Sequence, residues 1–315
     1  MISSMSVNNE NKPRVLGIVG ATASGKTSLS LQVAQRLNAE IICMDSMQVY
    51  RQMDIGTAKP TAEERALVPH HLIDIIDPSA SFSVAEYVPL AHACIADVIS
   101  RGHVPLLVGG TGLYLQGISM PHDYGGLPSD PAIRAELQEV YERSGADALH
   151  SLLQSVDPET AARLHPHDIR RVIRAIEIFR LTGIPMSEHR ILQTEKSPYD
   201  MRLFAISWPR DELHRRIGYR VDEMMEHGLL EEVKSLLSDG VFPQAQSMQG
   251  LGYKELVPVI NGTETIASAT ERIKTGTRNY ARRQLIWYRR DQRIHWLDSV
   301  HLNHAAEQII NNWSD

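Results

Sequence analysis

Cysteine is scarce in this sequence, and its scarcity excludes several kinds of small stabilised domain. Only Cys43 and Cys94 occur among the 315 residues. Two cysteines so far apart cannot supply a zinc module of the CxxC kind, and they cannot build a disulfide framework. Because so few cysteines are typical of a reducing compartment, we expect a cytoplasmic protein.

Long apolar runs are also missing. Hydrophobic residues make up 43% of the chain, but no stretch approaches the roughly 18 consecutive apolar residues of a membrane span. The opening stretch MISSMSVNNENKPR is neither apolar nor rich in arginine, so we expect a disordered tail at 1–13 rather than a targeting signal. These absences predict a soluble globular protein that does not contact a membrane.

An excess of positive charge is absent too. The chain has 32 Lys and Arg residues against 38 Asp and Glu residues, a formal net charge of −6. This balance argues against a protein that coats nucleic acid with its whole surface, but it leaves room for a local basic patch. The length allows one large domain or two ordinary ones with an ample core.

The most informative stretch that is present is GATASGKT at residues 20–27. Two glycines with four residues between them, followed by Lys-Thr, form the pattern of a phosphate-binding loop. Backbone N–H groups and a helix N-terminus would hold a diphosphate, Lys26 would add charge, and the Thr27 hydroxyl would bind Mg²⁺. The predicted diphosphate-binding residues are Gly20, Ala21, Thr22, Ala23, Ser24, Gly25, Lys26 and Thr27.

Strands and helices alternate around this loop, and their order predicts the fold. A β-branched apolar run at 14–20 precedes the loop, and residues 28–38 follow it with helical periodicity. Further strands are expected at 40–46 and 104–110, with a helix near 84–100 between them. We therefore predict an α/β fold with a parallel sheet flanked by helices, of the P-loop NTPase type. Ligands of such sheets bind at the carboxyl ends of the strands.

The pattern changes after residue 119, which predicts a second domain. Residues 120–131 are rich in Pro and Gly, only helical patterns follow to about 190, and strand character returns at 201–208. We therefore predict an all-helical insertion at 120–197 within a core formed by 14–119 and 198–315, whose C-terminal part adds helices.

Asp45 is the acidic residue best placed to act on a ligand of the loop. It lies at the carboxyl end of the strand that follows the loop's helix. A structural role as a helix cap or turn residue is the alternative. The stretch 45–60 continues with Ser, Gln, Tyr and Arg, a polar and aromatic mixture that suits a nucleobase. Thr111, after the strand at 104–110, is expected at the same edge of the sheet.

Positive charge is concentrated in two predicted helices. In RRVIRAIEIFR, the arginines lie opposite an apolar face, and in 272–293 eight Lys and Arg residues stand against one acid with aromatic residues between them. Such stretches are typical of nucleic-acid contacts, although solvated faces of amphipathic helices are the alternative. The Gly-Leu-Gly turn within 248–255 is equally consistent with close approach to a ligand and with a tight turn packed on the core.

Together these stretches resemble the tRNA dimethylallyltransferases, also called tRNA isopentenyltransferases. The matching segments run in the family's order from about residue 14 to 298, and they are GATASGKT, DSMQVYR, DIGTAKP, HHLIDI, LLVGGTGLY, RVIRAIEIF, GLGYKE and RNYARRQLIWYR. The loop alone occurs in many enzymes, whereas the whole set is specific. Ala21 departs from the proline that the family usually has there, and the zinc finger of eukaryotic relatives is missing, as in the bacterial form.

The resemblance implies a reaction and roles for several residues. The reaction is transfer of the dimethylallyl group from dimethylallyl diphosphate to N6 of adenosine 37, beside the anticodon of tRNA, with release of diphosphate. Asp45 would be the general base or the hydrogen-bond acceptor at N6. Thr22 and Arg220 would stabilise the diphosphate together with Lys26 and Thr27-bound Mg²⁺. The target base must leave the anticodon-loop stack to reach the donor.

The resemblance also implies how tRNA is bound by a protein that we expect to be a monomer. The helical insertion would grip the anticodon stem-loop. The predicted tRNA-contact residues are Asp45, Ser46, Met47, Gln48, Thr111, Arg170, Arg171, Val172, Ile173, Arg174, Met248, Gln249, Gly250, Leu251, Gly252, Tyr253, Arg278, Arg282, Arg283, Gln284, Trp287 and Arg289.

Two other functions are consistent with part of the sequence. A small-molecule kinase would use the same loop for ATP, with the helical insertion as its lid. The strand at 104–110, however, ends in Gly-Gly-Thr and not in the Asp that would hold its Mg²⁺. A non-catalytic tRNA-binding protein would have no need of an intact loop and Asp45. Transfer of label from dimethylallyl diphosphate or from ATP separates these functions.

Overall fold

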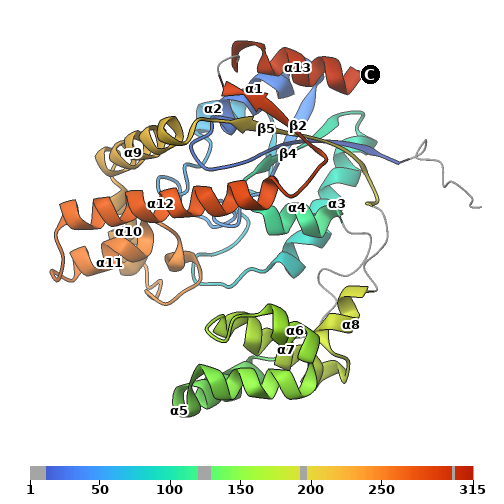
Figure 1. Cartoon of the computed structure of the whole chain (residues 1–315). Helices are drawn as coiled ribbons and strands as arrows, with labels where there is room; N and C mark the ends of the chain where they lie inside the picture. Colours follow the sequence, from blue (N-terminus) through green and yellow to red (C-terminus); the bar gives the residue numbers. More distant parts are fainter. Residues whose placement is uncertain (1–11, 120–128, 192–196, 300–301, 315) are drawn as a thin grey trace, which may run out of the picture. The chain divides into compact units, whose positions relative to one another are not determined.

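The computed structural model describes residues 12–119, 129–191, 197–299 and 302–314 (Figure 1). The predicted N-terminal tail up to residue 11 and most of the predicted linker, at 120–128, lie outside these residues. The chain divides into two compact units. One consists of residues 1–118 with 198–315, and the other is the segment 119–197.

The first unit contains a six-stranded sheet with the order β3-β2-β4-β1-β5-β6, and every pair of neighbouring strands is parallel. This arrangement confirms the predicted α/β fold. The strands are β1 (Arg14–Val19), β2 (Ala39–Cys43), β3 (His70–His71), β4 (Val104–Gly109), β5 (Asp200–Ser207) and β6 (Ile294–Asp298).

The central strand β1 joins chain segments that lie on either side of the second unit. Its Gly17 pairs with Leu107 of β4 on one side and with Leu203 of β5 on the other. Leu16 and Ile18 of β1 are fully buried, which is typical of a strand covered on both faces of a parallel sheet. The sheet therefore continues across the gap in sequence that the second unit occupies.

Helices cover both faces of this sheet. The helices α1 and α13 contact each other, and both supply residues to one apolar core with the sheet, whereas α3 packs on β2 and β4 from the opposite side (Figure 1). The helices of the first unit that precede β5 are α1 (Lys26–Leu37), α2 (Ala62–Leu67), α3 (Val84–Ser100) and α4 (Gly112–Ser119). Those that follow β5 are α9 (Arg210–Glu226), α10 (Leu229–Ser238), η1 (Ser247–Gln249), α11 (Tyr253–Ile260), α12 (Ile266–Tyr288) and α13 (Leu302–Ser314).

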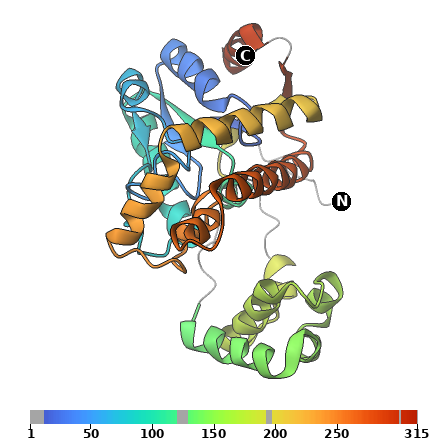
Figure 2. The same ribbon diagram turned by 90° about the vertical axis from the view of Figure 1, so that its left-hand side faces the viewer.

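The helices α9 and α12 lie side by side over the phosphate-binding loop (Figures 1 and 2). Ala21 and Ala23 of the loop pack against Leu213 and Ile217 of α9 and against Ala281 of α12. The helix predicted at 272–293 is therefore present, but it begins earlier, at Ile266, and ends at Tyr288. Arg289 caps it instead of lying within it.

The regular secondary structure in the described residues of the second unit is helical. Its helices are α5 (Pro131–Val156), α6 (Pro158–Arg163), α7 (Ile169–Thr182) and α8 (Met186–Ile191). Leu137 and Leu149 of α5 and Val172 and Ile176 of α7 belong to a core of its own. Within the part of the chain that the structure describes, no helix is long and apolar enough to cross a membrane.

Candidate active site

The phosphate-binding loop connects β1 to the N-terminus of α1. Gly20 and Gly25 have φ angles of 133° and 93°, a region that residues with a side chain rarely adopt. The helix begins at Lys26, so its first N–H groups and the positive end of its dipole face the loop. This is the geometry in which helix N-termini bind phosphate.

Side chains from α9, α12 and the segment before α9 hold the outer side of the loop. Trp208 Nε1 donates to the carbonyl oxygen of Ser24 at 2.9 Å, and Arg216 Nε donates to that of Ala23 at 2.9 Å. The backbone N–H of Thr22 donates to Gln284 Oε1 at 2.9 Å. The conformation of the loop is therefore set by groups more than 180 residues away in the chain. Sequence reasoning missed Trp208 and Arg216 because neither belongs to a local motif.

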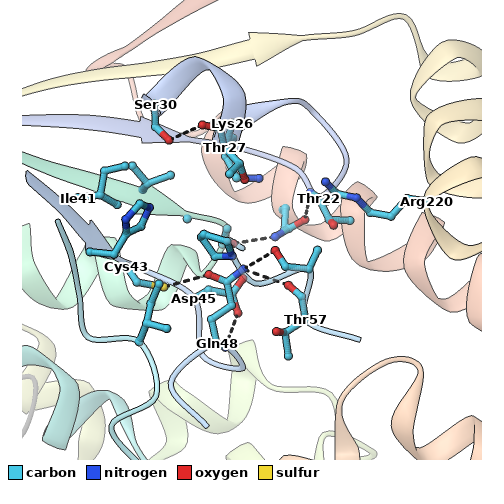
Figure 3. A pocket seen from close by; sticks show the side chains of 18 of the residues that line it. Thr22, Lys26, Thr27, Ser30, Ile41, Cys43, Asp45, Gln48, Thr57 and Arg220 are labelled. Carbon is cyan, nitrogen blue, oxygen red and sulfur yellow. Dashed lines mark hydrogen bonds between the residues drawn. The ribbon is translucent and has the colours of Figure 1, made fainter. Parts of the chain in front are cut away.

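A cavity of about 90 Å³ opens between this loop and the carboxyl ends of β2 and β4. Figure 3 shows Arg220 at one side of it, Ile41 and Cys43 at the other, and Asp45 between them. Tyr280, His70 and Ile73 also line it, although they were not among the predicted site residues. The predicted site residues that line the cavity are Thr22, Lys26, Thr27, Asp45, Gln48, Arg220 and Gln284.

Two partly buried cations, Lys26 and Arg220, line this cavity. Burial, and next the nearby Arg220, lower the pKa of Lys26 to about 8, while Asp45 opposes the shift. Burial is also the main cause that lowers the pKa of Arg220. Neither cation forms an ion pair with a carboxylate in the ranges that the structure describes. Lys26 Nζ donates only to a neutral group, the carbonyl oxygen of Ala21, at 2.6 Å among the described residues. Positive charge drawn out of water without a carboxylate is costly, so this arrangement favours an anionic ligand.

Asp45 lies just beyond β2 and has two separate environments. Its Oδ1 accepts from the backbone N–H groups of Met47 at 2.9 Å and Gln48 at 3.4 Å, which fixes the side chain in a turn. Its Oδ2 has no hydrogen-bond partner among the described residues. Asp45 is therefore a turn residue that still presents one carboxylate oxygen to the cavity.

Thr111 and Ser46 form the rim beside this carboxylate. The backbone N–H of Ser46 donates to Thr111 Oγ1 at 3.0 Å, and the backbone N–H of Thr111 donates to the carbonyl oxygen of Met44 at 3.2 Å. Gly109 allows this approach, because a Cβ there would lie 2.0 Å from the same carbonyl oxygen. The predicted meeting of the ends of β2 and β4 is thus confirmed.

Gln48 and Gln284 use their side-chain amides within the protein. Gln48 Nε2 donates to the carbonyl oxygens of Thr57 at 3.0 Å and Ala58 at 3.2 Å, and its Oε1 accepts from Cys43 Sγ. Gln284 Nε2 donates to the carbonyl oxygen of Gly110 at 2.9 Å, and its Oε1 accepts from the loop. These contacts within the protein make both amides part of the shape of the cavity, and their predicted contact with RNA stays a prediction.

The predicted RNA-contact segment 248–253 is mostly internal. Met248 and Tyr253 are no more than 1% exposed, whereas Gln249 is exposed. The phenol of Tyr253 donates to Glu232 Oε1 at 2.6 Å. These two side chains belong to the packing around the turn, and the predicted RNA contacts of the segment stay predictions.

Arginines of α12 point in two directions. Arg278, Arg282 and Arg289 line one groove of about 650 Å³ between α9 and α12, as their spacing on one helical face predicted. Arg210 and His214 of α9 also line this groove and were missed. By contrast, the guanidinium of Arg283 lies 5.8 Å from the ring centre of Tyr280, and Trp287 packs on Gly112.

In the second unit, the predicted RNA-contact stretch at 170–174 contains both exposed and buried side chains. Arg170 and Arg171 of α7 are exposed, and Arg174 pairs with the buried Glu177 at 2.7 Å. Val172 and Ile173 are 0% and 7% exposed and belong to the core. The helix uses these two apolar side chains for its own packing, and their predicted contact with RNA stays a prediction.

The cavity offers a hydroxyl group as a candidate ligand for magnesium. No group of three or more His, Cys, Asp or Glu side chains suited to a metal occurs among the described residues. Thr27 lines the cavity beside Lys26, and Mg²⁺ in such loops needs only one hydroxyl because phosphate oxygens and water complete its shell. The donor set therefore fits an Mg²⁺ ion that arrives with a diphosphate, with Thr27 as its protein ligand.

Comparisons with known proteins identify the family. A family profile described as IPP transferase matches residues 48–291, and one described as isopentenyl transferase matches 13–70. The chain is 47% identical to a tRNA dimethylallyltransferase of Bacillus subtilis over 93% of this chain and 92% of the relative. The chain belongs to the tRNA dimethylallyltransferase family. A family member from Moorella thermoacetica is 48% identical over 90% of both chains.

Solved structures of this family have the same fold. A tRNA isopentenylpyrophosphate transferase from Bacillus halodurans aligns with a TM-score of 0.72 and 43% identity over 96% of both chains. A eukaryotic dimethylallyltransferase, described as acting on tRNA, aligns with a TM-score of 0.83 and 31% identity over 96% of this chain and 79% of that one.

Proposed function

We propose that the protein transfers a dimethylallyl group from dimethylallyl diphosphate to N6 of adenosine 37 in tRNA, giving N6-dimethylallyladenosine and diphosphate. The observation that carries the proposal is one cavity that contains both the phosphate-binding loop and the free carboxylate oxygen of Asp45. Membership of the tRNA dimethylallyltransferase family supports the same reaction.

The reaction requires groups that act on the attacking nitrogen and groups that act on the leaving diphosphate. A bond forms between N6 of the adenine and C1 of the allyl group, while the bond between C1 and the diphosphate oxygen breaks and its electron pair leaves with the diphosphate. The exocyclic nitrogen is a weak nucleophile because its lone pair is delocalised into the ring. Asp45 Oδ2 is the acceptor for the N6 proton, since its other oxygen is held in the turn.

The leaving diphosphate gains negative charge, and the opposite side of the cavity is built to stabilise it. Lys26 and Arg220 supply positive charge, and Thr22 is held by the bond from its backbone N–H to Gln284. Mg²⁺ bound through the hydroxyl of Thr27 would neutralise part of the diphosphate charge when it is present. Because both cations already line the cavity before the donor binds, they require little reorganisation when the bond breaks.

We propose that tRNA binds through the exposed arginines of two places. In the first unit these are Arg282 and Arg283 of α12. In the second unit they are Arg170 and Arg171. A single chain holds the whole cavity, so we propose that a monomer is active. We place the reaction in the cytoplasm, where unmodified tRNA is available.

The kinase alternative lacks support at the end of β4. That strand ends in Gly109 and continues to Gly110 and Thr111, so it offers no carboxylate to hold a nucleotide-bound Mg²⁺. The family comparisons also favour prenyl transfer over phosphoryl transfer.

One experiment tests the proposed function against this alternative. Unmodified tRNA is incubated with the protein and either dimethylallyl diphosphate labelled in the allyl group or ATP labelled in the γ-phosphate. We expect label in tRNA only from the allyl donor. Label transferred from ATP, or release of ADP in proportion to the amount of tRNA modified, would overturn the proposal.

A further inference from the structure

Glu232, near the start of α10, binds a turn from a distant part of the chain and is not used in the chemistry described above. Its Oε2 accepts from the backbone N–H groups of Asp54 at 2.9 Å and Ile55 at 2.8 Å. Its Oε1 accepts from the backbone N–H of Gly56 at 3.1 Å and from the phenol of Tyr253 at 2.6 Å. One carboxylate therefore joins three segments of the first unit.

Dipoles, and not a cation, compensate the charge of Glu232. Within the described residues it forms no ion pair with a lysine, an arginine or a histidine. Three successive backbone N–H groups that converge on one anion form a nest, and hydrogen bonds to a charged acceptor are about twice as strong as neutral ones. The turn at 54–56 is thus organised around a negative charge that comes from another element.

The ring of Tyr253 fits tightly against this turn. It is 1% exposed, and a Cβ at Gly56 would lie 2.5 Å from a ring carbon. A Cβ at Gly250 would lie 3.2 Å from another ring carbon. Because both neighbours are glycines, the ring cannot shift without moving the turn or the segment 248–253.

The turn continues directly into the wall of the cavity. Thr57 and Ala58 line the cavity, and their carbonyl oxygens hold the amide of Gln48 (Figure 3). The backbone N–H of Gln48 in turn donates to Asp45 Oδ1. A continuous series of contacts thus runs from Tyr253 through Glu232 and the turn to the proposed general base.

We propose that Glu232 is a positioning residue that holds the cavity wall at 54–58 in place against the segment 248–253. It acts through Gln48 on Asp45 and does not touch the reactants. The inference rests on the proposed transfer reaction, because the wall that it positions is the wall of the donor cavity. Without the carboxylate, the wall moves away from the donor and the turn around Asp45 loosens.

The test is the Glu232→Gln variant. Its amide has nearly the same shape but has one acceptor oxygen for four donors, and its NH₂ group faces N–H groups. We expect the KM for dimethylallyl diphosphate to rise about tenfold, and kcat to fall, the scale of one lost charge-assisted hydrogen bond. Affinity for tRNA should stay within about twofold, because Glu232 is not one of the predicted RNA-contact residues. The control is Glu231→Gln, since Glu231 is exposed and its one ion pair among the described residues is with Lys234, at 3.4 Å.

The outcomes separate this inference from the proposed function. A purely structural role predicts a lower unfolding temperature and a smaller active fraction, with the KM for the donor equal to that of Glu231→Gln, and that result overturns the inference. If Glu232→Gln does not fold, Tyr253→Phe removes one donor while keeping the ring, and an unchanged KM there overturns it equally. A wild-type protein that transfers no allyl group to tRNA overturns the proposed function itself.

Discussion

Asp45 divides its two carboxylate oxygens between structure and chemistry. The oxygen in the turn orients the side chain, and the other oxygen has no protein partner among the described residues. The sequence alone left a turn residue and a catalytic base as alternatives. The structure shows that one side chain can serve both roles, because a carboxylate has two acceptors.

Asp45→Asn separates the two roles. The amide oxygen can keep the turn, but the amide nitrogen cannot accept a proton, so we expect the single-turnover rate of prenyl transfer to fall by about 10²–10⁴. Affinity for tRNA should change by no more than a few-fold in a filter-binding titration. Asp77→Asn is a suitable control, since Asp77 is exposed and bonds only within its own turn. A near-wild-type rate for Asp45→Asn would remove Asp45 from the mechanism.

Lys26 makes donor binding depend on pH. Its pKa of about 8 in the free site means that the ammonium loses its proton as the pH rises through that value. Only the charged form attracts the diphosphate, so we expect the KM for dimethylallyl diphosphate to be constant near pH 7 and to increase above pH 8. Initial rates measured from pH 7 to 9.5 at constant ionic strength test this. In Lys26→Ala the KM should be high throughout, and a rise of the same size in that variant would assign the titration to another group.

At the scale of elements, local patterns identified most of the sheet, and contacts between distant segments determined the rest. The buried runs of β1, β2, β4 and β5 were predicted because each is long and apolar. The strand β3 has only two residues, His70 and His71, so it has no periodicity of its own. The short edge strand β6 (Ile294–Asp298) was hidden by the basic residues before it. The early start of α12 was missed although Thr265 caps it.

The candidate site follows the same division. The loop and Asp45 were predictable because glycine spacing and strand ends have local physical meanings. The internal use of Gln48 and Gln284 was not predictable, since their partners come from other segments. Burial of Val172 and Tyr253 was likewise decided by tertiary packing.

The arginines of α12 give a prediction at this scale. Arg282 and Arg283 lie on different faces, toward the groove and toward Tyr280. If each contacts an RNA phosphate, Arg282→Ala and Arg283→Ala should weaken tRNA binding additively, and each should reduce the log–log salt slope by about 0.7. Binding titrations at three salt concentrations measure this slope. Lys274→Ala is the matched control, because Lys274 on the same helix is already paired with Asp222 and Glu271. A double mutant with the wild-type slope would make these arginines ordinary surface charges.

At the scale of the whole molecule, the two units have separate cores, and the sheet of the first is complete without the second. All residues that line the cavity belong to the first unit. Substitutions in the second unit should therefore change the affinity for RNA without changing the affinity for the donor.

Arg170 and Arg171 test this separation. We expect the double variant Arg170→Ala/Arg171→Ala to bind tRNA about tenfold less tightly, because two phosphate contacts are lost. Its affinity for dimethylallyl diphosphate, measured by calorimetry, should equal that of the wild type. Arg163→Ala is the control, since Arg163 is in the same unit and pairs with Glu159 at 2.9 Å. Equal tRNA affinity in the double variant and the control would exclude the second unit as an RNA contact.

The most direct test of the whole account is the chemical identity of the modified nucleoside. Two anticodon stem-loop RNAs that differ only in adenosine or guanosine at position 37 are incubated with the protein, Mg²⁺ and dimethylallyl diphosphate, then digested and analysed by mass spectrometry. We predict N6-dimethylallyladenosine from the adenosine RNA, no prenylated nucleoside from the guanosine RNA, and none with Asp45→Asn on the same time scale. Absence of the product from the adenosine RNA, or its equal formation by Asp45→Asn, would contradict the account.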